Sequence, residues 1–141
     1  MENGANKRII IFGIQFNEPL KSKYKMQIKK KSTSILVTTN GMSNAEQELS
    51  AILLNNYLKL LVDEDLLPNA LLFYGEGVKT VVENSPFLEA LSVLEKKGVN
   101  LIVCKTCLNF YGISDQIKVG KVGAMADIIH YQWNVDKVIT I

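Results

Sequence analysis

The stretch Leu101-Ile102-Val103-Cys104-Lys105-Thr106-Cys107-Leu108-Asn109-Phe110-Tyr111-Gly112 contains the pattern that decides the fold. Its first three residues are apolar and two of them are β-branched, which predicts a buried strand running into Cys104. Residues 106–111 predict a short helix, and Gly112 is a typical helix stop. A buried strand followed at once by a helix is typical of an α/β protein with a parallel sheet.

Residues 34–141 repeat this alternation of strands and helices. Compact apolar stretches predict further strands at residues 34–39, 70–74 and 137–141. Longer helices are expected to begin at Ser43, at Ser85-Pro86 and near Ala124. Nearly continuous apolar strands separated by helices indicate an α/β domain with a mostly parallel sheet and helices on both faces.

The apolar residues of the three longer helices predict which faces are buried. The first helix is expected to begin with a capping box, in which Ser43 and Glu46 bond to free amide groups. His130 lies on the stripe of the last helix, and we expect it in the core or in an interface. The expected stripes are Leu49, Ile52, Leu53, Tyr57, Leu60 and Leu61; Phe87, Leu88, Leu91 and Leu94; and Met125, Ile129 and Trp133.

Residues 1–33 differ from the rest of the chain in charge. They carry eight Lys or Arg against two acidic residues, whereas residues 34–141 carry eight against twelve. A strand at residues 8–12, turn chemistry at Asn17-Glu18-Pro19 and alternation over residues 24–29 predict a basic hairpin or arm preceding the domain. Aromatic residues are few there, so a solvated surface is expected rather than a nucleic-acid partner.

The overall composition indicates a chain that can bury its own core. It has 141 residues, of which 48% are hydrophobic, and only two cysteines. No apolar run reaches the roughly 18 residues that span a bilayer, and the N-terminus lacks a secretion-signal pattern. We therefore expect a cytoplasmic protein without a membrane segment, in which the cysteines stay reduced.

Three loops are candidates for a functional site, because ligands of open α/β sheets gather beyond the carboxyl ends of the strands. They are residues 39–42, 74–77 and 104–107, and the third contains both cysteines. A helix N-terminus and the cation of Lys105 favour a thiolate. Cys104 should face the cleft and be the more reactive thiol, with Cys107 secondary.

Other residues of these loops have both functional and structural interpretations. Asn40 and Gly41 would shape an anion pocket or form only a turn. Gly75 and Gly77 would present amides to a ligand or only allow unusual backbone angles. Glu76 is a candidate acid or base. Two cysteines and the distant His130 are too few for an intramolecular zinc site, and we expect neither a metal nor a cofactor.

The cysteine loop resembles that of the DsrE/DsrF-like family, most closely the second domain of YedF-type proteins. The resemblance covers roughly residues 34–141 and includes residues 34–42, 73–79 and 136–139. It implies a parallel α/β sheet, a homo-oligomer and a cysteine at the end of the third strand that carries a persulfide, which corresponds to Cys104. Cys107 matches the second cysteine of some members, and Tyr111 is a candidate hydrogen-bond donor to the persulfide.

Three classes of function follow from these patterns. The first is a sulfur or selenium carrier, or a sulfurtransferase-like protein, which exchanges sulfur with a donor or acceptor protein. The second is a module that binds a small ligand or a partner without turnover. The third is a redox switch that cycles Cys104 and Cys107 through a disulfide. Whether the protein is an enzyme is left open. Surplus apolar surface near Ile129 and Trp133 predicts a dimer or trimer.

Overall fold

The computed structural model describes residues 8–11, 14–17 and 30–141, and the chain divides into two compact units, residues 1–30 and 31–141. In the first unit, β1 (Arg8–Ile11) pairs antiparallel with β2 (Ile14–Asn17). Asn17, the first residue of the expected turn, lies in β2 opposite Arg8, and the other two residues of that turn fall outside the described residues. The second strand expected at residues 24–29 falls outside the described residues.

The second unit contains a five-stranded parallel sheet with the order β6-β5-β4-β3-β7. This confirms the expected α/β fold, and the strands expected from sequence are present within one or two residues. The short edge strand β6 was not expected, because its three residues show no apolar run. The strands are β3 (Thr33–Val37), β4 (Ala70–Phe73), β5 (Asn100–Cys104), β6 (Lys121–Gly123) and β7 (Lys137–Thr140).

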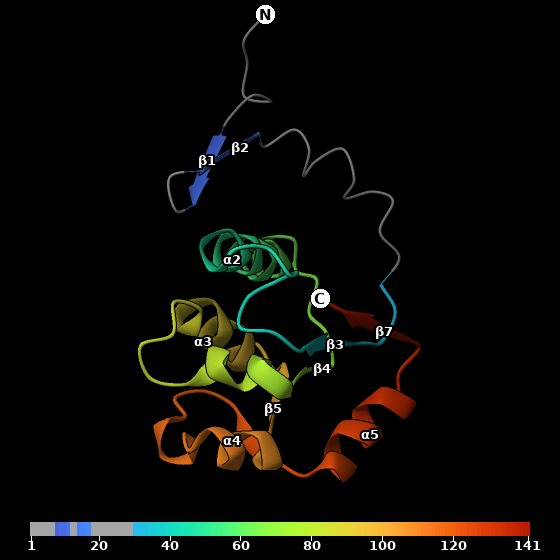
Figure 1. Cartoon of the computed structure of the whole chain (residues 1–141). Coiled ribbons are helices and arrows are strands. Elements are labelled where there is room, and N and C mark those ends of the chain that lie inside the picture. The colour runs from blue at the N-terminus through green and yellow to red at the C-terminus, as the bar shows by residue number, and fades with distance from the viewer. Residues whose placement is uncertain (1–7, 12–13, 18–29) are drawn as a thin grey trace, which may run out of the picture. The chain divides into compact units, whose positions relative to one another are not determined.

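Helices cover both faces of this sheet (Figure 1). Helices α2 (Gln47–Asp63) and α3 (Leu88–Lys96) contact each other on one face, where Val37 and Phe73 are buried. Helix α5 (Met125–Trp133) lies on the other face, where the Ser34 hydroxyl donates to the Tyr131 carbonyl at 2.7 Å. The remaining elements are α4 (Lys105–Tyr111) and the 3₁₀ segments η2 (Gly75–Val81) and η3 (Ser114–Gln116).

Helix α2 begins differently from the expectation. Ser43 has a φ of +73° and its hydroxyl accepts from the Ala45 N–H, so the predicted capping box is wrong. The Ser50 hydroxyl instead accepts from the Met42 N–H at 2.9 Å and donates to the Met42 carbonyl at 2.8 Å. These bonds attach the loop to the second turn of α2, which therefore starts only at Gln47.

The buried face of α2 is rotated from the expected one. Leu49 and Leu60 are exposed, and Leu61 is the one residue of the expected stripe that is buried. The residues on the buried face are Ser50, Leu54, Asn55, Leu58 and Leu61. Because a helix turns about 100° per residue, a stripe assigned one position away points to a different side.

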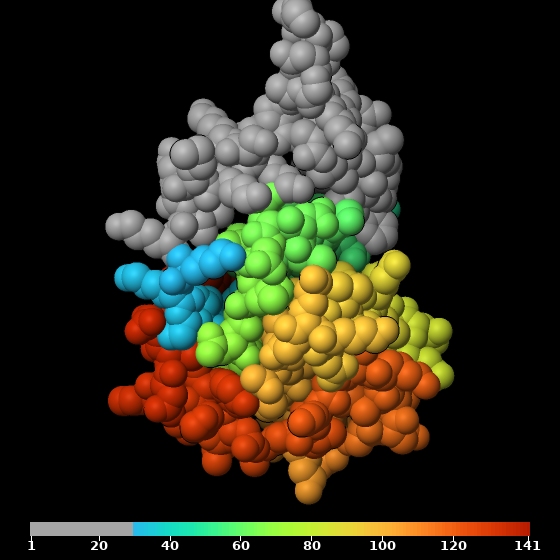
Figure 2. Space-filling view, turned by 180° about the vertical axis from the view of Figure 1, so that it is seen from behind, coloured from blue at the N-terminus to red at the C-terminus, as the bar shows by residue number. Residues whose placement is uncertain are grey.

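Helices α3 and α5 also differ in burial. In α3, Leu91 and Leu94 are buried as expected, and the Ser85 hydroxyl accepts from the Phe87 N–H just before the helix. In α5 Ile128 alone is buried, so the expected stripe is on the surface. His130 is exposed and does not belong to the core of this chain. The C-terminal residues, which include α5 and are coloured red, form part of the molecular surface seen in Figure 2.

Candidate functional site

The three candidate loops lie at the same edge of the sheet. Strands β3, β4 and β5 are parallel neighbours, so residues that follow Val37, Phe73 and Val103 leave the sheet side by side. Cys104 is the last residue of β5, and α4 begins at the next residue. Helix α4 ends at Gly112, which has a φ of +67° as expected for its stop signal. The cysteine loop is therefore fixed between a central strand and a short helix.

The two free thiols have different surroundings. Cys104 is only 2% exposed, whereas Cys107 is partly exposed and its Sγ accepts a hydrogen bond from the Gly75 N–H at 3.1 Å. Burial raises the pKa of the Cys107 thiol. The Gly75 N–H offsets part of this rise in pKa, and the neighbouring Cys104 thiol adds to it. Cys104 does not face an open cleft as expected, because it is buried in the core.

The glycines of the site have distinct roles. Gly75 has a φ of +57°, a conformation that glycine adopts easily, and this turn directs its N–H to Cys107. A Cβ on Gly77 would overlap the Val37 carbonyl oxygen, so a side chain there would push η2 away from β3. A Cβ on Gly41 would overlap the Ser50 side chain. Of the three, Gly75 alone presents its amide to a thiol, and the other two permit close packing.

Among the remaining candidate residues, Glu76 and Tyr111 both contact Lys79. Lys105 is exposed at the start of α4. The Glu76 carboxylate accepts from Lys79 Nζ at 3.0 Å. The same Nζ lies 4.4 Å from the centroid of the Tyr111 ring. Tyr111 therefore contacts a cation, a role that sequence reasoning missed because Lys79 lies 32 residues before it in the chain.

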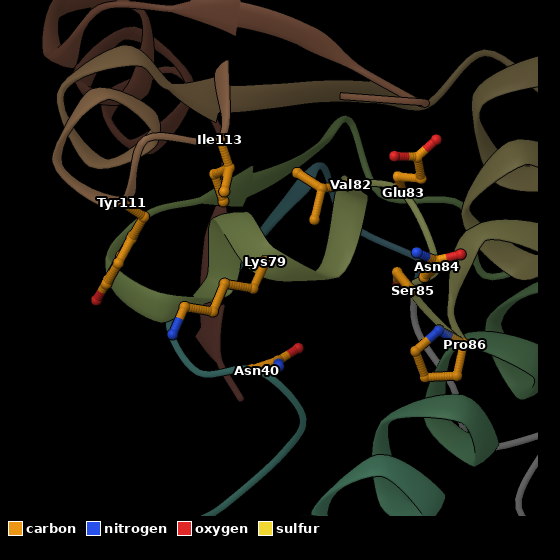
Figure 3. A pocket seen from close by; sticks show the side chains of 9 residues that line it. All are labelled: Asn40, Lys79, Val82, Glu83, Asn84, Ser85, Pro86, Tyr111 and Ile113. Carbon is orange, nitrogen blue, oxygen red and sulfur yellow. The ribbon is translucent and has the colours of Figure 1, made fainter. Parts of the chain in front are cut away.

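A cavity of about 410 Å³ adjoins this group of residues (Figure 3). Asn40 and Lys79 lie on one side of it, and Ser85 and Pro86 face them from the other. The lining residues are Asn40, Lys79, Val82, Glu83, Asn84, Ser85, Pro86, Tyr111 and Ile113. Sequence reasoning had assigned Asn40 and Tyr111 to the site, but it gave no reason to add the residues around Ser85, which we interpreted as a helix start.

Neither a metal-ligand cluster nor a membrane-spanning helix occurs in the described part of the chain. There, no three His, Cys, Asp or Glu side chains gather in the manner of metal ligands. None of the described helices is both long and apolar enough to cross a bilayer.

A parallel α/β unit with two thiols at the carboxyl edge of its central strands defines the class of this protein. Residues 31–141 match the DsrE/DsrF-like family, and the chain belongs to that family. This confirms the resemblance to the DsrE/DsrF-like family, while the closer likeness to YedF-type proteins stays a prediction. The comparison with curated protein sequences gives no match.

Two solved structures are similar to this chain in fold. The ychN protein from E. coli has a TM-score of 0.56 and 20% identity, over 78% of this chain and 99% of its own. Protein MTH1491 from Methanobacterium thermoautotrophicum has a TM-score of 0.56 and 18% identity, over 78% of this chain and 98% of its own. At such identities the likeness concerns the fold.

Proposed function

We propose that this chain is a cytoplasmic, sulfurtransferase-like sulfur or selenium carrier that uses the pair Cys104 and Cys107. One observation carries the proposal: the two thiols are neighbours at the carboxyl edge of the sheet, and the Gly75 N–H donates to Cys107 Sγ at 3.1 Å. A backbone N–H directed at sulfur stabilises negative charge on a thiolate or on a persulfide anion. Membership in the DsrE/DsrF-like family supports this use of the cysteine loop.

The different burial of the two thiols supports a different role for each in sulfur transfer. Cys107 is the thiol that a donor can reach, because it is partly exposed. Cys104 is the persulfide-forming nucleophile, as its place at the end of the third strand of the domain implies, and its 2% exposure would shield the stored sulfur from solvent. Cys107 thus takes up the sulfur and Cys104 holds it.

The transfer needs two displacements at sulfur. The Cys107 thiolate attacks the outer sulfur of a donor persulfide, the donor S–S bond breaks, and the donor leaves as a thiolate that takes up a proton. The Cys104 thiolate then attacks the outer sulfur of the Cys107 persulfide, and Cys107 leaves as a thiolate. Each step forms one S–S bond and breaks one, so no oxidant or reductant is consumed.

The proposal includes the assembly of this chain into a homo-oligomer, either a dimer or a trimer. Three apolar residues of α5, Met125, Ile129 and Trp133, are exposed and follow one another at intervals of four. Residues four apart lie on nearly the same side of a helix, so together they form an apolar surface. A second copy of this chain would cover this surface, while the sulfur donor or acceptor would be another protein or a small molecule.

Mass spectrometry after treatment with a persulfide donor tests the function. The wild type should gain one sulfur atom, and peptide mapping should place it on Cys104. Cys107→Ser should load slowly, since the reachable thiol is gone. Cys104→Ser should load at Cys107 and lose the sulfur quickly to dithiothreitol.

The same experiment separates the alternatives. Loss of two hydrogens across the pair, without gain of sulfur, would favour a thiol redox switch, which the proximity of the two thiols also permits. No change in mass for any of the three proteins would reject the sulfur carrier and favour a binding module, for which the cavity beside Tyr111 is the supporting observation.

A further inference from the structure

The cavity beside Tyr111 has the size of a small-molecule site. Its volume of about 410 Å³ lies within the range of typical ligand pockets, roughly 300–1,000 Å³. Apolar walls come from Val82, Pro86 and Ile113, and the Tyr111 ring forms part of the lining. A few polar groups among apolar walls are the usual composition of a site that orients a small molecule.

Lys79 and Asn40, the polar groups on one side of the cavity, offer hydrogen-bond donors. Lys79 is the one cation among the lining residues, and its three N–H donors exceed the single bond to Glu76. The side-chain amide of Asn40 makes no hydrogen bond to any residue that the structure describes, and it lies beside Lys79 in Figure 3. Among the lining residues Glu83 alone is acidic, and its carboxylate is 3.8 Å from Lys118 Nζ. This end of the cavity suits a carboxylate.

Two contacts between η2 and α4 relate the cavity to Cys107. The contacts between η2 and α4 include Gly75 with Cys107 and Lys79 with Tyr111. The partners are four residues apart in both segments. Four residues correspond to about 6 Å along α4, so Tyr111, whose ring contacts Lys79 Nζ, lies about one helical turn from Cys107. A short mercapto acid can bridge this interval.

We infer that the cavity binds a small persulfide that carries a carboxylate, with Lys79 and Asn40 holding the carboxylate and the sulfur directed to Cys107. The inference rests on the proposed function and names the class of its donor. The Cys107 thiolate attacks the outer sulfur, the donor S–S bond breaks, and the small molecule leaves as a thiol that still carries its carboxylate.

Binding can be measured apart from sulfur transfer. The ¹⁵N-labelled full chain is titrated with 3-mercaptopropionate and with the neutral 2-mercaptoethanol, and amide shifts are recorded. We expect 3-mercaptopropionate to shift amides of η2 and of residues 82–86, and to bind Lys79→Gln roughly five- to tenfold more weakly, because a charged hydrogen-bond donor is lost. Asn40→Ala should weaken binding in the same direction. Lys59→Gln, which removes an equal charge on α2, should bind as the wild type does.

Sulfur uptake from the persulfides of the same two thiols completes the test. At low concentration the carboxylate donor should load the wild type faster than the neutral one, and this preference should vanish in Lys79→Gln. Equal loading from both donors, independent of Lys79, would overturn the inference and leave the sulfur carrier in place. Binding of 3-mercaptopropionate that depends on Lys79, with no loading from either donor, would reject the sulfur carrier and leave a carboxylate site.

Discussion

Helices α3 and α5 have the same length and similar apolar content, but they differ in how much of their apolar side is buried. In α3, Leu91 and Leu94 of the predicted stripe are completely buried in the core. In α5 the predicted stripe is exposed, Trp133 to 81%, and Ile128 is the buried residue. The difference shows that periodicity predicts a helix and its apolar side, but not whether that side meets its own chain or another.

The largest expected effect is that of Leu91→Ala in α3. Removal of a fully buried leucine leaves a cavity, so the free energy of unfolding should fall by about 2–5 kcal/mol. Trp133→Ala in α5 should change the stability of the monomer by no more than about 0.5 kcal/mol. Urea unfolding at low protein concentration measures both. Equal losses would mean that the two helices are packed alike.

Ile128→Ala and Ile129→Ala compare adjacent, identical residues of α5. Ile128 is buried and Ile129 is exposed, so the first change should cost about 2 kcal/mol, at the low end for such residues, and the second should cost little. Since α5 contacts β5, which ends at Cys104, Ile128→Ala should also speed alkylation of that thiol several-fold. Unchanged labelling in Ile128→Ala would show that α5 does not protect Cys104.

Trp133→Ala should act on assembly instead of folding. If the exposed stripe of α5 binds a second copy, removal of its largest side chain should weaken association at least about tenfold. Phe110→Ala is the control, since Phe110 is an equally exposed aromatic residue on α4. Light scattering over a concentration series gives the answer, and a wild type that remains monomeric at micromolar concentration would contradict the proposed oligomer.

A smaller effect is expected for the pH dependence of Cys107 labelling. This prediction concerns the carboxyl ends of the strands instead of the helices on the faces of the sheet. Burial raises the pKa of Cys107, so less thiolate exists at neutral pH than for an ordinary thiol of pKa about 8.5. Iodoacetamide labelling of Cys104→Ser should therefore be slower at pH 7 in the folded protein than in urea, and it should rise as pH passes the ordinary value. A labelling midpoint that lies lower in the folded protein than in the unfolded chain would show that the Gly75 N–H outweighs burial.

The smallest effect is expected from removing residues 1–29. Residues 31–141 form a compact unit of their own, and β3 finds both its neighbours within that unit. The shortened chain should keep a cooperative thermal transition within a few degrees of that of the full chain. A broad transition, followed by circular dichroism, would place the domain boundary elsewhere.

The sequence predicted the strands and the sheet-edge position of the cysteine loop well, because apolar runs and the glycine stop at Gly112 act locally. It predicted the buried side of α2 poorly, because leucines occur on both its buried and its exposed sides. The contact of Lys79 with Tyr111, the burial of Cys104 and the short strand β6 depend on segments distant in the chain. Such contacts leave no periodic pattern that a single sequence reveals.

The pairing of β3 with β7 has a consequence for synthesis in the cell. The first strand of the sheet needs the last one: the Ser32 hydroxyl donates to the Asp136 carboxylate at 3.0 Å, across 104 residues of chain. Until β7 has left the ribosome, one edge of β3 has no partner, and an unpaired apolar edge allows other chains to add a strand. A chain that ends before β7 would therefore have an intact thiol loop and an edge of β3 to which other chains can add a strand.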